Sequence, residues 1–278
     1  MRPLRSTLAA LLPVLAAGVL GLAGCSSTAG DGGATDASSR SAAGPDGESV
    51  TVELTGGEFD GRSYEVVVPA GVDEPFPVIL ALHPHGGNAS QARAAFGLDG
   101  PAAAQGFATV YPSGPGESWN AGDCCGEAAE EDRDDVGFLE AVVDDLAGRF
   151  DVDTDRVYVT GFSNGAMMTY RLACESDVAA AIAPVSGVVV TDCPDPLPLP
   201  VLHIHGKADD VVPADGSEGS GGLVPRLSAA RSAELLAGDQ EHEVVLLDGI
   251  DHSWPDARRT DGAYDAPQEI VAFFAALP

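Results

Sequence analysis

The sequence pattern best suited to chemistry is Gly161-Phe162-Ser163-Asn164-Gly165, which matches Gly-x-Ser-x-Gly. The apolar segment Val157-Tyr158-Val159 precedes it, and a stretch of helical character follows. A serine on a sharp strand-to-helix turn presents its hydroxyl at the end of a parallel sheet, and flanking glycines leave room for the tight backbone. The pattern therefore predicts Ser163 as the nucleophile of an acyl-transfer reaction.

A serine hydroxyl is a weak nucleophile and needs a base, commonly a histidine oriented by a carboxylate. With this serine turn, the acid follows the serine along the chain and the histidine comes last. His252 lies in a loop after the last predicted strand, whereas His242 stands at the mouth of an apolar strand, so we favour His252. The acid should follow the preceding core strand, where the spacing leaves Asp209 and Asp210 open.

Two backbone amides are expected to stabilise the oxyanion that forms during acyl transfer. One amide belongs to Asn164, directly after the nucleophile. The other belongs to the turn after the third predicted strand, Leu82-His83-Pro84-His85-Gly86-Gly87, where His85 is the candidate donor.

Two His-x-His pairs suggest metal binding as an alternative, because imidazole is a common ligand. They are His83 with His85 and His203 with His205. Both pairs lie at the carboxyl ends of predicted core strands, where polar residues line a crevice. We therefore favour a hydrogen-bonded role for these histidines and expect no metal and no other cofactor.

The elements that must position these residues follow from hydrophobic patterning. Two alternating segments, 50–54 and 64–68, are bounded by Gly and Pro and predict early strands. From residue 77 onward, apolar strands alternate with helical stretches, the first of them at 91–105. This alternation predicts an α/β fold with a mostly parallel central sheet and helices on both faces.

The first residues have the pattern of an export signal. Arg2 and Arg5 precede a short apolar run that ends in Leu22-Ala23-Gly24-Cys25. The run is shorter than the roughly 20 apolar residues that a membrane-spanning helix needs. Its ending resembles the bacterial lipobox, which implies a signal peptide at 1–24 and a lipid on Cys25.

Composition divides the rest of the chain. The segment 25–48 is rich in Ser, Gly, Ala and Asp and cannot bury enough apolar surface to fold, so it predicts a flexible linker. The remaining 49–278 has the length of one domain. A net charge of −29 disfavours nucleic acid and anionic membrane surfaces as partners, so membrane attachment would depend on the lipid. The oligomeric state stays open.

Four cysteines besides Cys25 form an even set in a chain expected to be exported, which predicts two disulfides. They are Cys124, Cys125, Cys174 and Cys193. Of the three connectivities, the one that bonds the adjacent pair is the least favoured. The paired spacing typical of a zinc site is absent.

Several longer motifs occur in order along the domain: Tyr111-Pro112-Ser113-Gly114, Ser118-Trp119-Asn120-Ala121-Gly122-Asp123-Cys124-Cys125-Gly126, Asp134-Asp135-Val136-Gly137-Phe138, Val157 to Met168, His205-Gly206-Lys207-Ala208-Asp209 and His252-Ser253-Trp254-Pro255. Together they resemble the esterase/polyhydroxybutyrate-depolymerase family of the α/β-hydrolase superfamily, which also holds feruloyl and acetylxylan esterases. The resemblance implies an α/β-hydrolase fold. It also implies a triad of Ser163, Asp209 and His252, with Asp209 chosen as the third residue after His-Gly.

The resemblance further implies that Trp119 and Trp254 lie near the acyl or alcohol pocket, although core packing is an equal alternative for Trp119. The chain departs from the family pattern at Pro84, where the family usually has Gly. Proline has no N–H, so the following amide, on His85, remains the donor. No separate polymer-binding domain is evident, which weakens the case for a polymer depolymerase.

The sequence thus predicts a serine esterase that is exported and either held by lipid at the outer face of the cell membrane or secreted. Its partner would be a small-molecule or polymer-linked ester, with feruloyl, acetyl or short hydroxyalkanoate groups. One alternative is an acyltransferase of the cell envelope, in which water is excluded and another acceptor takes the acyl group. The other is a non-catalytic surface-binding lipoprotein, for which a broken triad would be expected.

Overall fold

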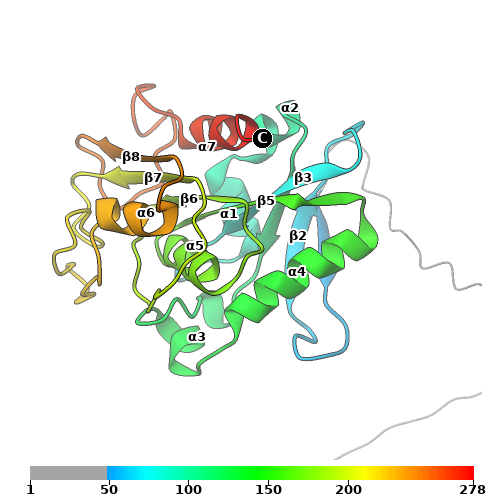
Figure 1. The fold of residues 1–278 in the computed structure, drawn as a ribbon, viewed down its shortest axis with the longest axis horizontal. Coiled ribbons are helices and arrows are strands. Elements are labelled where there is room, and N and C mark those ends of the chain that lie inside the picture. Colours follow the sequence, from blue (N-terminus) through cyan, green and yellow to red (C-terminus); the bar gives the residue numbers. More distant parts are fainter. Residues whose placement is uncertain (1–48) are drawn as a thin grey trace, which may run out of the picture. The chain divides into compact units, whose positions relative to one another are not determined.

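A computed structural model describes residues 49–278, so the predicted signal peptide, the lipid site at Cys25 and the linker lie outside the described residues. Strands of this part form an 8-stranded sheet in the order β1-β2-β4-β3-β5-β6-β7-β8 (Figure 1). Their bounds are β1 (Val50–Glu53), β2 (Ser63–Val67), β3 (Phe76–Leu82), β4 (Ala108–Pro112), β5 (Val152–Phe162), β6 (Ala181–Val185), β7 (Val201–Gly206) and β8 (His242–Leu247). The β1–β2 and β2–β4 pairs are antiparallel and the other pairs are parallel, which confirms the predicted mostly parallel sheet.

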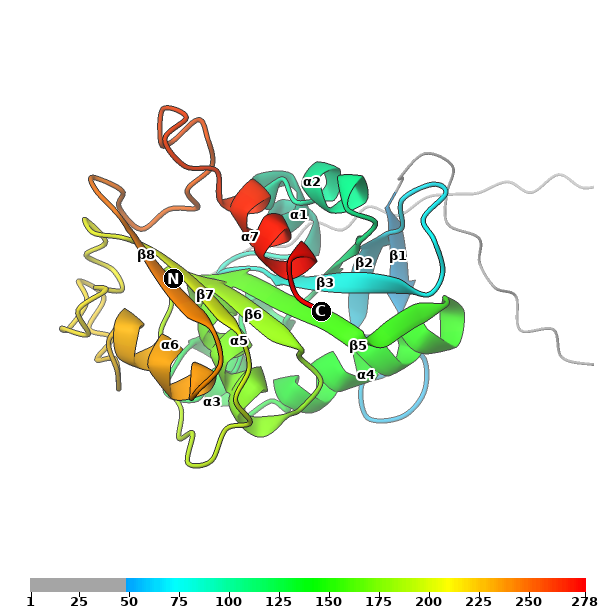
Figure 2. The ribbon, with the colours of Figure 1, turned by 45° about the horizontal axis from the view of Figure 1, so that its top comes forward.

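Helices cover both faces of the sheet (Figure 2). They are α1 (Ala89–Phe96), α2 (Asp99–Ala104), α3 (Gly126–Glu130), α4 (Asp135–Arg149), α5 (Asn164–Glu175), α6 (Ala229–Ala237) and α7 (Ala266–Ala275), with a 3-10 turn at Pro115–Glu117. One buried cluster joins the sheet to α4, α5 and α6, and a second joins it to α1, α2 and α7. Within the described residues, no helix is long and apolar enough to cross a membrane.

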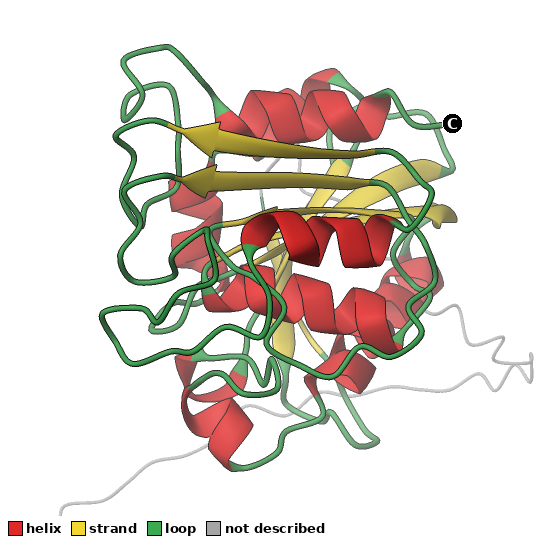
Figure 3. Cartoon of the chain, turned by 60° about the vertical axis from the view of Figure 1, so that its left-hand side comes forward, coloured by secondary structure: helices red, strands yellow, loops and turns green. Residues whose placement is uncertain are grey.

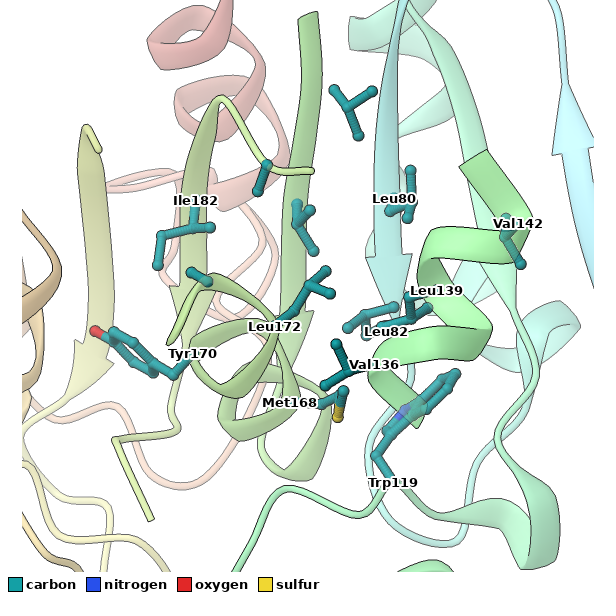
Figure 4. Packing of buried hydrophobic residues seen from close by; sticks show 14 of the residues in the cluster. Leu80, Leu82, Trp119, Val136, Leu139, Val142, Met168, Tyr170, Leu172 and Ile182 are labelled. Carbon is teal, nitrogen blue, oxygen red and sulfur yellow. The ribbon is translucent and has the colours of Figure 1, made fainter. Parts of the chain in front are cut away.

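Strand β3 shows why the central strands are apolar throughout. Its side chains alternate between faces, so Leu80 and Leu82 join the first cluster and Ile79 joins the second. On the first face, Leu82 packs near Leu139 of α4 and Met168 of α5 (Figure 4). Burying each such side chain contributes about 1.5–3 kcal/mol, so this interior holds the strand ends rigidly.

One helix predicted from the sequence is divided into two helices in the structure. The segment expected to be helical over 91–105 forms α1 and α2, because Gly97 adopts a left-handed conformation (φ 66°) that ends α1. Glycine takes this conformation at little cost, and a left-handed residue commonly ends a helix. The break turns the chain so that both short helices lie over β4.

The predicted pair of disulfides is present, but its connectivity differs from the expectation. Cys174, near the end of α5, is bonded to Cys193 in the loop after β6, and their Cα atoms are 5.2 Å apart. That separation lies in the ordinary range for a disulfide. The remaining cysteines, Cys124 and Cys125, are bonded to each other. Disfavouring the adjacent pair was therefore wrong.

Candidate active site

The loops beyond the carboxyl ends of the parallel strands gather on one side of the sheet (Figure 3). Ser163 lies there, on the turn between β5 and α5, with a backbone φ of 55° and ψ of −118°. A positive φ is unfavourable for serine and persists only where the surroundings enforce it. Gly165 is part of those surroundings, because a Cβ at this position would collide with the backbone carbonyl oxygens of Leu82 and His83.

Three of the predicted site residues lie in one line of hydrogen bonds. His252 Nε2 is 2.8 Å from Ser163 Oγ, and His252 Nδ1 is 2.7 Å from Asp209 Oδ2. Because a carboxylate only accepts, Nδ1 carries the proton that it donates to Asp209. Nε2 of a neutral ring is then free to accept the proton of the serine hydroxyl. This arrangement can generate a serine nucleophile.

Asp209 and its neighbour Asp210 lie in different surroundings. Its side chain is buried, whereas Asp210 is exposed. Oδ1 of Asp209 accepts hydrogen bonds from the backbone amides of Val211 and Val212, at 3.0 and 2.8 Å. Burial by itself would raise the pKa of Asp209, but hydrogen bonds from His205, His252 and the Val212 amide hold that pKa well below its usual range. The carboxylate is therefore charged at neutral pH.

A chain of buried hydrogen bonds lies behind Asp209. Tyr170 Oη is 2.7 Å from His203 Nδ1, His203 Nε2 is 2.9 Å from His205 Nδ1, and His205 Nε2 is 2.7 Å from the Val212 carbonyl oxygen. That carbonyl can only accept. With one proton on each ring, every bond then runs from Tyr170 toward Val212. His205 Nε2 also lies 3.3 Å from Asp209 Oδ2.

These contacts occupy both ring nitrogens of His203 and of His205. Burial also lowers the pKa of His203 well below its usual range and raises that of Tyr170. The hydrogen-bonded role predicted for this His-x-His pair is therefore confirmed. Sequence reasoning missed Tyr170, because an aromatic residue inside a helical pattern predicts core packing.

The other His-x-His pair belongs to the turn after β3. His83 Nδ1 donates to the Pro84 carbonyl oxygen at 2.9 Å, and the Gly114 amide donates to His83 Nε2 at 2.9 Å. Burial lowers the pKa of His83 to about 4, which keeps the ring neutral and suits its role as an acceptor. His85 is exposed at the tip of the turn. The neutral ring of His83 thus fixes the conformation of a turn that contains proline.

Trp119 connects this turn to the serine turn. Its indole Nε1–H donates to the His83 carbonyl oxygen at 2.9 Å, and its backbone amide donates to Asn164 Oδ1 at 2.8 Å. The Asn164 side-chain nitrogen donates back to the Trp119 carbonyl oxygen at 3.0 Å. Trp119 has no exposed surface and packs in the core (Figure 4). The predicted substrate contact of Trp119 is therefore wrong, because the side chain is buried and links the two turns by hydrogen bonds.

The two predicted oxyanion donors are the backbone amides of His85 and Asn164. The amides that follow His85 in the turn after β3 already donate hydrogen bonds within the protein. The Gly86 amide donates to the Glu117 carbonyl oxygen at 2.7 Å, and the Gly87 amide donates to that of Pro84 at 3.0 Å. Within residues 49–278, no hydrogen-bond acceptor is present for the amides of His85 and Asn164. These two N–H groups can therefore serve a ligand.

A pocket of about 280 Å³ lies beside His252. Phe96 of α1 stacks on Trp254 with ring centroids 4.1 Å apart, and Phe162 meets Trp254 edge to face. Trp254 thus lies at the pocket where it was predicted. The lining of the pocket includes Gln91, Phe96, Phe162, His252, Trp254 and Arg259.

This sheet, with its serine turn and its ordered acid and histidine, has the α/β-hydrolase fold, and the comparison with solved structures agrees. The S-formylglutathione hydrolase of Agrobacterium tumefaciens is 16% identical and superposes with a TM-score of 0.62, over 82% of this chain and 95% of that one. The acetyl xylan esterase of Aspergillus awamori is 16% identical with a TM-score of 0.59, over 82% of this chain and all of that one. At identities this low, the superposition shows a shared fold and nothing about activity.

The named sequence relatives are esterases. A protein named as an esterase, NocK of Nocardia uniformis subsp. tsuyamanensis, is 38% identical over 162 residues, which are 56% of this chain and 47% of that protein. Feruloyl esterase C of Emericella nidulans is 33% identical over 176 residues, 59% of this chain and 61% of that protein. The bifunctional acetylxylan esterase/xylanase XynS20E of Neocallimastix patriciarum is 30% identical, over 57% of this chain and 23% of its own length. The chain therefore spans less than two thirds of each of these relatives.

A family model gives a different label. Residues 63–193 match the X-Pro dipeptidyl-peptidase (S15) family, a little under half of the chain. The matched part contains Ser163 but ends before Asp209 and His252. Among the named relatives and structural neighbours, ester and thioester hydrolases recur: feruloyl esterase, acetyl xylan esterase and S-formylglutathione hydrolase.

Proposed function

We propose that this chain is a serine carboxylic ester hydrolase in which Ser163 is the nucleophile, His252 the general base and Asp209 the acid of the triad. The observation that carries the proposal is the continuous line of hydrogen bonds between these side chains, at 2.8 and 2.7 Å, on a strained turn. The names of the sequence relatives support an ester as the substrate.

In the proposed reaction, Ser163 Oγ attacks the ester carbonyl carbon while His252 Nε2 takes the hydroxyl proton. The charge of Asp209 stabilises the imidazolium that results. The free amides of His85 and Asn164 donate to the oxyanion of the tetrahedral intermediate. The intermediate collapses as His252 protonates the departing alkoxide, which leaves an acyl-enzyme. A water deprotonated by His252 then attacks, and the carboxylic acid leaves as Ser163 regains its proton.

The pocket and the names of the relatives support a proposal for the substrate class. Rings from Phe96, Phe162 and Trp254 form apolar walls that fit a flat or short apolar group. Feruloyl and acetyl esters suit such walls, and short hydroxyalkanoate esters are the other candidates. An acyltransferase would use the same acyl-enzyme, so the assays include an alcohol acceptor and measure transesterification.

Amide hydrolysis is the second candidate, because residues 63–193 match a peptidase family. An X-Pro p-nitroanilide therefore belongs in the same panel as the esters. The ester panel contains p-nitrophenyl acetate, p-nitrophenyl butyrate, methyl ferulate and a hydroxybutyrate oligomer.

The deciding experiment compares the purified protein with Ser163→Ala on this panel. Loss of the nucleophile should lower kcat at least about 10⁴-fold, with an unchanged circular dichroism spectrum and Tm. Ser90→Ala is the matched control, since Ser90 is an exposed serine on α1. Ester turnover retained by a folded Ser163→Ala protein would contradict the assignment of the nucleophile.

The proposal extends to where the protein acts. An export signal at 1–24 and a lipid on Cys25 would hold the domain outside the cell, and two disulfides suit an oxidising compartment. Fractionation of bacteria that express the full chain tests this. The protein should partition with membranes, and Cys25→Ser should release it; equal membrane partitioning of both proteins would rule the lipid anchor out.

A further inference from the structure

Within the part of the chain that the structure describes, almost every cationic side chain is paired with an acid. The whole chain has 14 Lys and Arg for 43 Asp and Glu. In residues 49–278, every Lys and Arg side chain except that of Arg259 lies within 4.0 Å of a carboxylate oxygen. The guanidinium of Arg259 has no hydrogen bond or ion pair with the described residues.

The turn around Arg259 holds its backbone through a carboxylate whose side-chain partner is the neighbouring arginine. Asp256 lies before Arg259 in the same turn, and its Oδ2 accepts hydrogen bonds from the Arg258 guanidinium, with the closer one at 2.8 Å. Asp256 Oδ1 accepts from the backbone amides of Arg258 and Arg259, at 3.1 and 2.9 Å. The carboxylate therefore fixes the backbone of Arg259 while its ion pair goes to the neighbouring arginine.

Arg259 lines the pocket that also contains His252. No Asp or Glu lines this pocket, although acids outnumber cations threefold in the chain. The cavity next to the β1–β2 connection, by contrast, combines two arginines, Arg62 and Arg133, with five acids: Glu58, Asp60, Glu131, Asp132 and Asp134. A pocket with apolar walls, one free guanidinium and no carboxylate is complementary to an apolar group that ends in an anion.

We propose that Arg259 binds a carboxylate carried by the ester substrate, so that the preferred substrates are esters with an apolar segment and a free carboxylate. This inference rests on the proposed esterase function. The guanidinium offers a planar fork of donors that matches a carboxylate. The overall negative charge does not prevent this, because charges beyond about 8 Å are largely screened at physiological ionic strength.

The carboxylate could belong to the acyl part or to the alcohol part of the ester, and two substrate pairs distinguish them. For the acyl part, mono-p-nitrophenyl glutarate is compared with p-nitrophenyl pentanoate. For the alcohol part, 4-acetoxybenzoate is compared with its methyl ester. The measured quantity is the ratio of kcat/KM for the anionic ester to that for its neutral partner.

In one of the two pairs, Arg259→Gln should lower this ratio roughly three- to fivefold, the upper range for an ion pair made by an exposed side chain such as that of Arg259. The effect should lie mainly in KM, and added salt should reduce the ratio of the unsubstituted protein. Arg258→Gln is the matched control, because it removes an adjacent guanidinium that pairs with Asp256 and does not line the pocket. A ratio unaffected by Arg259→Gln in both pairs, or lowered equally by Arg258→Gln, would overturn the proposal.

A binding experiment separates this inference from the esterase proposal. Monomethyl glutarate and 4-acetoxybenzoate are titrated into the Ser163→Ala protein and into Ser163→Ala/Arg259→Gln. Weaker binding of at least one anion by the double variant supports the anion site even if no ester is hydrolysed, in which case only the esterase proposal fails. Equal binding by both proteins would overturn the anion site, whatever the turnover.

Discussion

At the scale of single residues, the two oxygens of Asp209 have different partners. Oδ1 is held by the backbone amides of Val211 and Val212, and Oδ2 faces the imidazoles of His252 and His205. The backbone therefore fixes the rotation of the carboxylate, and this leaves the second oxygen in line with the imidazole that would act as base. Asp210, one residue on, has neither set of contacts.

Asp209→Asn should lower kcat by about 10⁴-fold with little loss of folding. The amide keeps the shape of the carboxylate, but its NH₂ can face His252 Nδ1 and favour the tautomer in which Nε2 carries the proton. That tautomer cannot accept the proton of Ser163. Kinetics of Asp210→Asn provide the control, and an equal loss in the two variants would contradict the choice of Asp209.

Ser163 and His252 were predictable because the serine motif sets local backbone geometry and chain order, whereas spacing left Asp209 and Asp210 open and only the family resemblance favoured Asp209. Sequence reasoning could not find the roles that depend on folded contacts. Trp119 belongs to a motif near the site, but only its burial shows that it faces inward. Arg259 belongs to no motif, and the role proposed for it depends on knowing the partners of the other cations in residues 49–278.

At the scale of elements, the strands and the longer central helices were predictable from their periodicity, but α3, α6 and the strand order were not. Strand β4 lies between β2 and β3, and no local pattern indicates which strands become neighbours. The helix break at Gly97 was not predicted, because an isolated glycine is tolerated within many helices. The pairing of cysteines likewise depends on which elements the fold brings together.

The Cys174–Cys193 disulfide ties the end of α5 to the loop after β6 and closes a segment of 19 residues. A loop of that length predicts about 3 kcal/mol of stabilisation through the unfolded chain. Cys174→Ser/Cys193→Ser should therefore lower Tm by roughly 6–12 °C.

The other disulfide provides the comparison. Cys124 and Cys125 are adjacent, so their bond closes almost no loop, and loop-closure entropy predicts a smaller effect. Calorimetry of Cys124→Ser/Cys125→Ser measures it. If that variant lost as much stability as the other, loop closure would not explain the contribution of Cys174–Cys193.

At the scale of the whole molecule, folding buries histidines in neutral form, and this ties stability to pH. Burial lowers the pKa of His83 to about 4 and that of His203 well below its usual range. An unfolded histidine has a pKa of about 6.5. Between these values the unfolded chain binds more protons than the folded one, so stability is full above pH 6.5 and declines as the pH falls.

For His83 alone, the difference between a folded pKa of about 4 and an unfolded value near 6.5 predicts a loss of about 2 kcal/mol at pH 5 relative to pH 7. Protonation would also prevent Nε2 from accepting the hydrogen bond of the Gly114 amide, which loosens the turn that carries the His85 amide.

The variant His83→Gln tests this pH dependence, because glutamine keeps an acceptor and a donor without a titrating group. Its Tm should therefore fall roughly 4–8 °C less than that of the unsubstituted protein between these pH values. His242→Gln changes an exposed histidine at the start of β8 and should keep the full decline. If His83→Gln and the unsubstituted protein lost the same stability, the pH dependence would have to come from groups other than His83.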